Sequence, residues 1–335
     1  MILGLDVRRA RKGDCLILHY GTKDDPGLIL IDGGPSQVYK PHLKPRLAQI
    51  RKGRGVAGDR PLVVDLLMVS HIDDDHINGI LELTKELVTA ADEKKPLPLK
   101  ILRFWHNSFD GIIGNAPREL LSSIQASFGA AGFNGELDSE GFDAYTAKVL
   151  ASVAQGVRLR DDAKKLKLPI NKEFGGKLVM ADSGTSIDLG KGLQFTVAGP
   201  MKTDLLALQK EHDAFLEKAR KEAGKAALAA FTDTSVANLS SIVLVAETKK
   251  KRILLTGDAR GDKILEGLEK AQLLKPGGKM HLDILKVPHH GSDRNMATIF
   301  FERVTADHYV FSGDGEHGNP ECETVADAFG RARGQ

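Results

Sequence analysis

The chain has 335 residues, of which 41% are hydrophobic and 27% charged, and its formal net charge at pH 7 is +2. This length allows one large domain or two smaller ones, and the small net charge argues neither for nor against a nucleic-acid partner. Cys15 and Cys322, the two cysteines, are too few for a secreted disulfide scaffold and form no CxxC zinc motif. No apolar run reaches 18 residues, and MILGLDVRRA does not resemble a signal peptide, so we expect a cytoplasmic protein with no membrane span.

Three short strands are predicted first, at residues 1–7, 15–20 and 28–32. The third ends in Asp32-Gly33-Gly34, and paired glycines after a strand leave room beside a site. Asp32 is a candidate second-shell carboxylate, one that orients a metal-bound histidine, or else an ordinary turn aspartate. Residues 36–60 are basic and predict a helix followed by a loop.

The most informative stretch is LVVDLLMVSHIDDDHINGIL, residues 62–81. It opens with an apolar, β-branched run broken only by Asp65, which predicts one buried strand over 62–69. It closes with apolar residues at helical spacing. Between them stand five ionisable side chains, namely His71, Asp73, Asp74, Asp75 and His76. Adjacent carboxylates repel one another unless a cation is near, and carboxylate with imidazole suits zinc, manganese or iron. The alternative is a solvated acidic loop.

The middle of the chain is less readable. Residues 99–105 predict a strand that ends at His106, and residues 110–190 are rich in Gly, Ala and Ser and predict an insertion that covers or borders the site. A strand at 193–197 and a charged, alanine-rich helix at 203–230 follow.

The last third returns to apolar strands. Residues 240–247 and 253–256 lead to Gly257-Asp258, a helix is expected at 262–273, and the strand at 282–287 ends in Pro288-His289-His290-Gly291. A final strand at 308–312 leads into GDGEHGNPE. Because three strand ends carry His or Asp beside Gly, we expect them to converge at one sheet edge and form a metal site.

The motifs LILIDGG, SHIDDDHINGI, LLTGDA and LKVPHHGS, in this order, resemble the metallo-β-lactamase-fold hydrolases. The similarity is greatest to the ComEC-like branch, the hydrolase domain of a DNA-uptake competence protein and its stand-alone relatives. The resemblance covers residues 1–325 and implies a single α+β domain, a four-layer αβ/βα sandwich, with 110–190 as an insertion or cap and 326–335 as a C-terminal tail. It also implies two divalent metal ions, zinc or manganese.

The resemblance also implies roles for individual residues. His71 and Asp73 would hold the first metal, Asp75 and His76 the second, and Asp258 would bridge them. His290 matches the last ligand of the family, and His289 would touch substrate, or be the ligand if the register is shifted by one. Asp75 or Asp258 would accept a proton from the water, and a histidine of the pair His289-His290, or His317, would stabilise the departing or equatorial oxygen.

Three features depart from the family pattern. Asp73 replaces the commoner histidine, which moves the preference from zinc toward manganese. The middle histidine has no counterpart, because Asn238-Leu239-Ser240-Ser241 stands in its place. His106, or water, could complete that metal; otherwise His106 is a polar residue that faces the cleft and contacts substrate. Near the end, Asn319 replaces a histidine and is a candidate donor to a substrate oxyanion.

We therefore expect a metal-dependent hydrolase with a dinuclear site and a bridging hydroxide, and we favour a phosphodiesterase or nuclease acting on single-stranded DNA or another nucleic acid. Arg294, and Arg260 two residues after Asp258, are candidates for a phosphate clamp or plain surface residues. One alternative is an acyl hydrolase of lactones, thioesters or amides. The other is a non-catalytic metal-binding module of a larger protein or complex, since the chain ends soon after its last motif.

Overall fold

The computed structural model describes residues 1–107, 144–181, 186–206, 240–293, 296, 298–315 and 318–330, with side chains in the helix after 144 described from residue 155. These residues form a mixed α/β protein with two main open sheets. Its short helical turns are the π-helix η1 (Tyr39–Leu43) and the 3-10 turns η2 (Lys172–Phe174) and η5 (Pro288–Gly291).

The first sheet is mixed and has the strand order β1-β2-β3-β5-β7. Strands β1 (Ile2–Val7), β2 (Leu16–Gly21) and β3 (Pro26–Ile31) form an antiparallel meander, and β5 (Leu66–Val69) and β7 (Phe104–His106) extend it in parallel. The expected strands at 1–7, 15–20 and 28–32 are confirmed within two residues at each end. Strand β5 pairs Val69 with His106, so the segment after Val69 leaves the sheet beside the end of β7.

The single strands expected at 62–69 and 99–105 are wrong in one respect, because each is two strands. Strands β4 (Leu62–Val64) and β6 (Leu99–Ile101) form a separate parallel pair, while β5 and β7 continue in the main sheet. Asp65 sits at the break and is buried, with its Oδ2 accepting a hydrogen bond from the Leu28 amide at 2.8 Å. The Lys191 ammonium lies 3.1 Å from Asp65 Oδ1 and supplies the compensating charge. A paired carboxylate thus takes the place of a ladder bond.

The second sheet has the order β13-β12-β11-β10-β9-β8. Strands β8 (Ser186–Gly190), β9 (Leu193–Gly199), β10 (Val243–Glu247) and β11 (Arg252–Leu255) are antiparallel, and β12 (Met280–Lys286) and β13 (Val304–Val310) run parallel to β11. The last strand begins four residues earlier than expected. Parallel neighbours need crossovers, which α8 (Gly261–Lys270) and α9 (Thr298–Arg303) provide.

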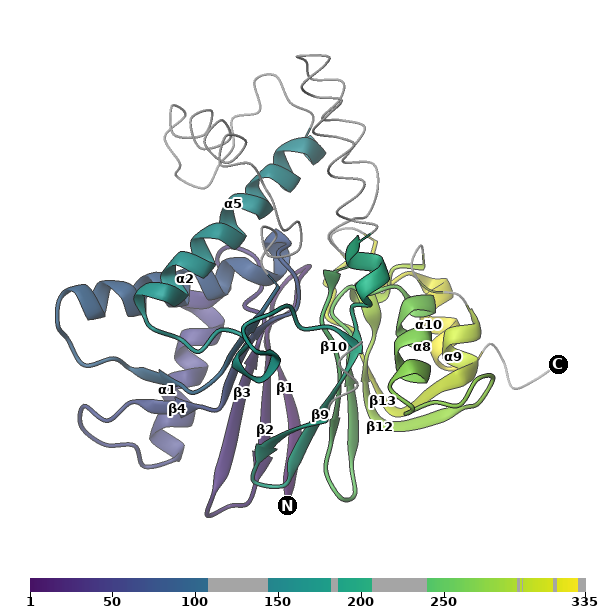
Figure 1. Ribbon diagram of the computed structural model, residues 1–335, viewed down its shortest axis with the longest axis horizontal. Coiled ribbons are helices and arrows are strands. Elements are labelled where there is room, and N and C mark those ends of the chain that lie inside the picture. The colour runs from purple at the N-terminus through teal and green to yellow at the C-terminus, as the bar shows by residue number, and fades with distance from the viewer. Residues whose placement is uncertain are drawn as a thin grey trace.

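Helices lie on the outer side of each sheet (Figure 1). Helices α1 (Lys44–Gly53), α2 (Asp74–Asp92) and α5 (Ala144–Lys165) flank the first sheet, and α8, α9 and α10 (Cys322–Ala328) flank the second. Three apolar clusters match this arrangement: one beneath each group of helices, and one that joins side chains of both sheets. In the shared cluster, the rings of Trp105 and Phe195 have centroids 5.9 Å apart.

Several expectations remain predictions. Residues 202–206 are helical, while the rest of the helix expected at 203–230 and residues 110–143 of the insertion expected at 110–190 lie outside the described residues. The single-domain boundary at 325 is untested. Among the described residues, no helix is long and apolar enough to cross a membrane.

Candidate metal centre

The polar strand ends meet at one edge of the structure. Asp32 follows β3, the segment 71–76 follows β5 and opens α2, Asp258 follows β11, and His290 follows β12. Asp32, His71, His76, Asp258 and His290 are buried, and Asp73, Asp74 and Asp75 are half-buried, although the strands belong to two sheets. The strand ends therefore bring residues more than 200 positions apart into contact.

Four of these residues form a compact donor group: Asp75, His76, Asp258 and His290, whose ligand atoms all lie within 4.8 Å of one another. His76 Nε2 is 3.3 Å from both Asp258 Oδ1 and His290 Nε2. His290 Nε2 is 3.4 Å from Asp258 Oδ2 and 3.6 Å from Asp75 Oδ2. Donors about 2.1 Å from one tetrahedral ion stand about 3.4 Å apart. The group thus has the spacing that a single cation requires.

A second pair of donors lies beside this group. His71 Nε2 is 3.8 Å from Asp258 Oδ2 and 3.9 Å from Asp73 Oδ2, and it has no hydrogen-bond partner among the described residues. Burial lowers the pKa of His71 to about 3, so the imidazole is neutral and its outer nitrogen is a free donor. A buried, unsatisfied nitrogen costs free energy unless something binds it. The residues present therefore fit a metal ion.

The inner nitrogens of the histidines are held by hydrogen bonds. His76 Nδ1 is 2.9 Å from Asp32 Oδ2, and the Ser70 hydroxyl donates to the same oxygen at 2.6 Å. Ser70 Oγ also lies 3.1 Å from His71 Nδ1. Metal-binding histidines usually have such a partner on the far nitrogen, because it fixes the ring and the tautomer. Asp32 thus stands where the sequence places an orienting carboxylate.

The charges of the cluster interact strongly. Burial alone would lower the pKa of His76 and of His290, but the Asp258 carboxylate raises both, that of His290 to about 9. Burial works in the opposite direction on Asp258, whose pKa nevertheless lies well below its usual value because His290 and His76 stabilise the carboxylate. Protons on these imidazoles occupy the positions where a cation would bind, so cation binding should release protons.

The backbone is unusual at two of the polar strand ends. His289 and His290 have φ values of 47° and 55°, and Asp32 has 57°. Residues other than glycine rarely adopt this left-handed backbone conformation. Where they do, the surrounding structure imposes it, often at a functional site. The turn after β12 directs His290 into the donor group, while His289 Nε2 stays 3.9 Å from Asp258 Oδ2 and outside that group.

The other predicted site residues are less close. Both ring nitrogens of buried His106 lack a hydrogen-bond partner among the described residues, and His106 belongs to none of the donor groups found there. The Asn319 backbone carbonyl accepts a hydrogen bond from the Gly315 amide at 3.1 Å, and Asn319 belongs to none of the donor groups found among the described residues. Asp74 is the first residue of α2, and its carboxylate accepts hydrogen bonds from the side chains of Asn78 and Gln155. Arg294 and His317 lie outside the described residues.

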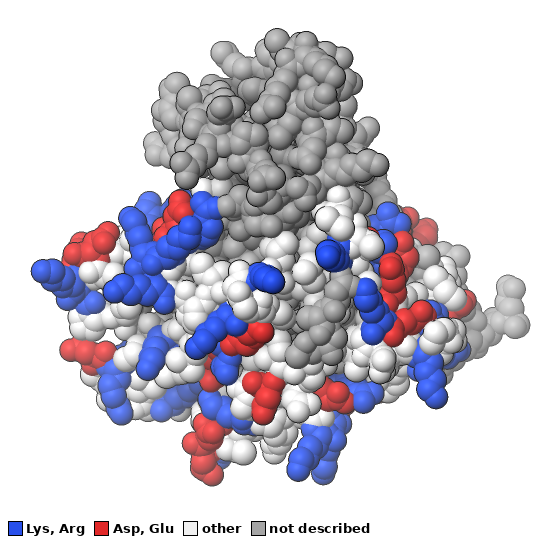
Figure 2. Space-filling view, viewed as in Figure 1, with Lys and Arg blue, Asp and Glu red and all other residues white. Residues whose placement is uncertain are grey.

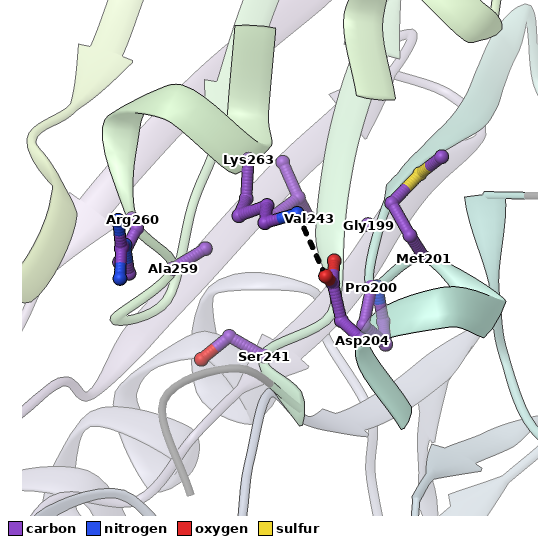
Figure 3. A pocket seen from close by; sticks show the side chains of 9 residues that line it. All are labelled: Gly199, Pro200, Met201, Asp204, Ser241, Val243, Ala259, Arg260 and Lys263. Carbon is purple, nitrogen blue, oxygen red and sulfur yellow. Dashed lines mark ion pairs between the residues drawn. The ribbon is translucent and has the colours of Figure 1, made fainter. Parts of the chain in front are cut away.

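Arg260 does not point into the cluster. Its guanidinium makes two 3.0 Å hydrogen bonds to Asp262, so it is an ordinary surface pair at the start of α8. It borders a pocket between this helix start and the turn after β9, in which Lys263 and Asp204 form an ion pair of 2.8 Å (Figure 3). The volume of this pocket, about 10 Å³, is at the lower limit for one water molecule. The pocket therefore has room for about one water molecule.

Three residues of the centre escaped the sequence analysis: Asp14, Lys286 and Ser312. Asp14 stands in Arg11-Lys12-Gly13-Asp14, between the first two predicted strands, and Lys286 stands within the strand predicted at 282–287. Both are buried. An aspartate beside glycine at a strand start repeats the theme of the other motifs, and a lysine inside an apolar run demands a partner, so both signals were present in the sequence.

No protein-family model matches the chain, and no curated protein shows significant similarity to it. The two mixed sheets and the buried His/Asp cluster are consistent with a metallo-β-lactamase-like fold. The ComEC-like branch remains a prediction.

Proposed function

We propose that the protein is a metal-dependent hydrolase with the four-layer αβ/βα sandwich of the metallo-β-lactamase fold, and that a phosphodiester is its substrate. The observation that carries the proposal is the donor group Asp75, His76, Asp258 and His290, assembled from both sheets with all ligand atoms within 4.8 Å. Helices outside both sheets and an apolar cluster between the sheets support the fold (Figure 1).

Two cations are favoured over one by the charges of the site. With the histidines neutral, the cluster and the groups that contact it hold one ammonium, Lys286, and five carboxylates, those of Asp14, Asp32, Asp73, Asp75 and Asp258. Four net negative charges remain, which two divalent cations would balance. The first would be held by His71, Asp73 and Asp258, and the second by the four-residue group. Buried charge without compensation is costly, so a single ion leaves the centre less stable.

When bound, such cations lower the pKa of a shared water and stabilise negative charge that develops on substrate oxygens. Asp258 is placed between both donor sets and can accept a proton, since its oxygens face His71, His76 and His290. The His289 side chain is 28% exposed, against 5% for His290, and so is the histidine better placed to meet a substrate and protonate its leaving oxygen.

The donor set is compatible with a phosphodiester substrate. Its three carboxylates and three imidazoles suit manganese as well as zinc, and manganese binds phosphate oxygens well. The face in Figure 2 carries Lys and Arg over the C-terminal part of α5, where Arg158, Lys164 and Lys165 are exposed, with acidic side chains interspersed. Such a surface is compatible with a phosphate backbone but does not select it.

The test compares two neighbouring carboxylates. Asp75→Asn removes a donor of the proposed site, whereas Asp74→Asn changes a carboxylate that bonds to Asn78 and Gln155. Metal content, and hydrolysis of bis-p-nitrophenyl phosphate and of a fluorescent single-stranded oligonucleotide, are measured with manganese and with zinc. We expect about two ions per chain in the wild type and in Asp74→Asn, and at least a 100-fold loss of hydrolysis in Asp75→Asn.

The other outcomes decide among the alternatives. Turnover of a lactone or thioester with no turnover of either phosphodiester would establish an acyl hydrolase. Two bound ions without turnover of any of these substrates would establish a binding module. A wild-type protein that binds no divalent cation would refute the proposal.

A further inference from the structure

We infer that Asp14, Lys286 and Ser312 form a positioning network for the metal ligands His290 and Asp258, in which the Lys286 ammonium is a permanent internal cation. The inference rests on the proposed metal centre and adds residues that the sequence motifs did not identify. It concerns how the chain itself prepares the centre, and it can be tested by metal binding apart from catalysis.

Lys286 is placed in a way that stability alone does not explain. Its side chain is fully buried, and its Nζ lies 2.6 Å from Asp14 Oδ2, which is also buried. Taking two charges out of water costs several kcal/mol per ion, so apolar side chains in their place would often be no less stable. A buried pair between the last residue of β12 and the loop before β2 therefore calls for a role other than cohesion.

The pair contacts the metal ligands on two sides. On one side, Lys286 Nζ donates to the Gly257 carbonyl at 3.1 Å and lies 3.8 Å from Asp258 Oδ1, so it anchors the turn that presents Asp258. The Thr256 hydroxyl returns a bond of 2.8 Å to the Lys286 carbonyl. The ends of β11 and β12 are thus locked together next to the proposed bridging ligand.

On the other side, Asp14 acts through Ser312. The Ser312 hydroxyl donates to Asp14 Oδ1, and Ser312 Oγ lies 3.1 Å from His290 Nδ1. This chain of bonds has one consistent direction: His290 Nδ1–H donates to Ser312, and Ser312 donates to Asp14. It leaves the lone pair of His290 on Nε2, the atom that faces Asp75 and Asp258. The network therefore selects the tautomer that can bind a cation.

Asp14 is itself held rigidly. Its amide donates to the Asp75 carbonyl at 3.2 Å, and a Cβ on the preceding Gly13 would lie 2.8 Å from the Asp75 carbonyl carbon. Such contacts are shorter than those of real Cβ atoms, so only glycine permits this approach. The loop before β2 is thereby fixed against the start of α2, which carries Asp75 and His76.

Three variants test the network. Ser312→Ala removes only the hydroxyl between His290 and Asp14, Asp14→Asn removes the carboxylate, and Lys286→Met removes the internal cation. The control is Asp65→Asn, because Asp65 is also a buried carboxylate paired with a lysine, at 3.1 Å from Lys191, but lies at the strand break outside the metal centre. Ser312→Ala is the mildest change and keeps the test valid if the ionic variants fold poorly.

The readouts are the cobalt(II) dissociation constant, measured by competition with a chromophoric chelator, and the visible spectrum of bound cobalt(II), which reports ligand geometry. We expect each network variant to bind cobalt at least about 10-fold more weakly with an altered spectrum, and Asp65→Asn to lose stability without either change. Unaltered affinity and spectrum in Ser312→Ala and Lys286→Met would overturn the inference while the proposed function stands. A wild type that binds no cobalt, manganese or zinc would overturn both.

Discussion

Helix α2 is seated on the turn after β3 through direct backbone contact, and one methyl group should dislodge it. Gly33 N donates to the His76 carbonyl at 2.7 Å, and Gly79 N donates to the Gly34 carbonyl at 3.0 Å. A Cβ on Gly79 would lie 2.6 Å from the Gly33 carbonyl carbon, whereas ordinary contacts begin at 3.4 Å. The Gly33 carbonyl oxygen would be nearer still, so Gly79→Ala forces the two segments apart by more than about 0.8 Å.

The magnitude follows from three effects. Overpacking of this kind costs about 2 kcal/mol, and weakening of the two hydrogen bonds adds about 1 kcal/mol. Alanine in place of glycine inside a helix returns about 1 kcal/mol. The net expectation is a loss of about 2 kcal/mol in the free energy of unfolding. Because the same turn of helix carries Asp75 and His76, metal affinity should also fall by 10-fold or more.

Urea unfolding followed by circular dichroism measures the first effect, and chelator competition measures the second. Gly53→Ala is the matched control, because Gly53 is the last residue of α1 and no atom lies within 4 Å of a Cβ added there. The free energy of unfolding of this variant should be unchanged or slightly raised. If Gly79→Ala is as stable as the wild type and binds metal equally well, α2 does not contact the turn in the way described.

Three further predictions follow from the structure. Cys15 is buried, and burial raises the pKa of its thiol, so it should resist iodoacetamide while the exposed Cys322 reacts. Peptide mapping of the labelled native protein should find the label on Cys322, and label on Cys15 would contradict the burial of that residue. Burial lowers the pKa of His106 to about 4, so the folded state resists protonation of this imidazole. Relative to His106→Leu, the wild type should keep its free energy of unfolding above pH 6.5 and lose up to roughly 3 kcal/mol of it as the pH falls toward 4. A difference in urea unfolding that does not change with pH would refute this. Manganese at about 100 times its dissociation constant should raise the free energy of unfolding by about 2.7 kcal/mol per site. The Tm should rise with it, EDTA should reverse the rise, and Asp258→Ala should not show it. Equal increases in Tm in both proteins would argue against the site.

The sequence predicted much of the fold because its strands are strongly apolar and several, such as β3 and β11, are closely followed by glycine. The ends of β3, β5, β11 and β12 fall within two residues of expectation, and with them the positions of Asp32, His71, Asp258 and His290. The break at Asp65 was visible only as one polar residue in an apolar run. Whether such a residue interrupts a strand depends on its partners, and the partners of Asp65 are the Leu28 amide and the Lys191 ammonium, far away in the sequence.

The network around Lys286 was missed for a related reason. Periodicity assigns a side chain to the interior, but it does not say which charge neutralises it, and Asp14 lies 272 residues earlier. Ser312 carries even less signal, since a serine after a strand is common in turns. Candidate ligands that lie close together within one motif can be predicted from the sequence. The groups that orient them come from distant parts of the chain and meet only when the two sheets pack together.

The origin of the donors in both sheets has a consequence for how the chain folds. His76 and Asp258 are 182 residues apart, so an ion that binds both would act as a reversible staple across the whole loop between them. In the chain-entropy view, a cross-link over a loop of more than 100 residues restricts the unfolded chain by about 4–5 kcal/mol. The ions proposed for the reaction would then also hold the two sheets together. A chelator would therefore lower the stability of the fold as well as empty the metal site.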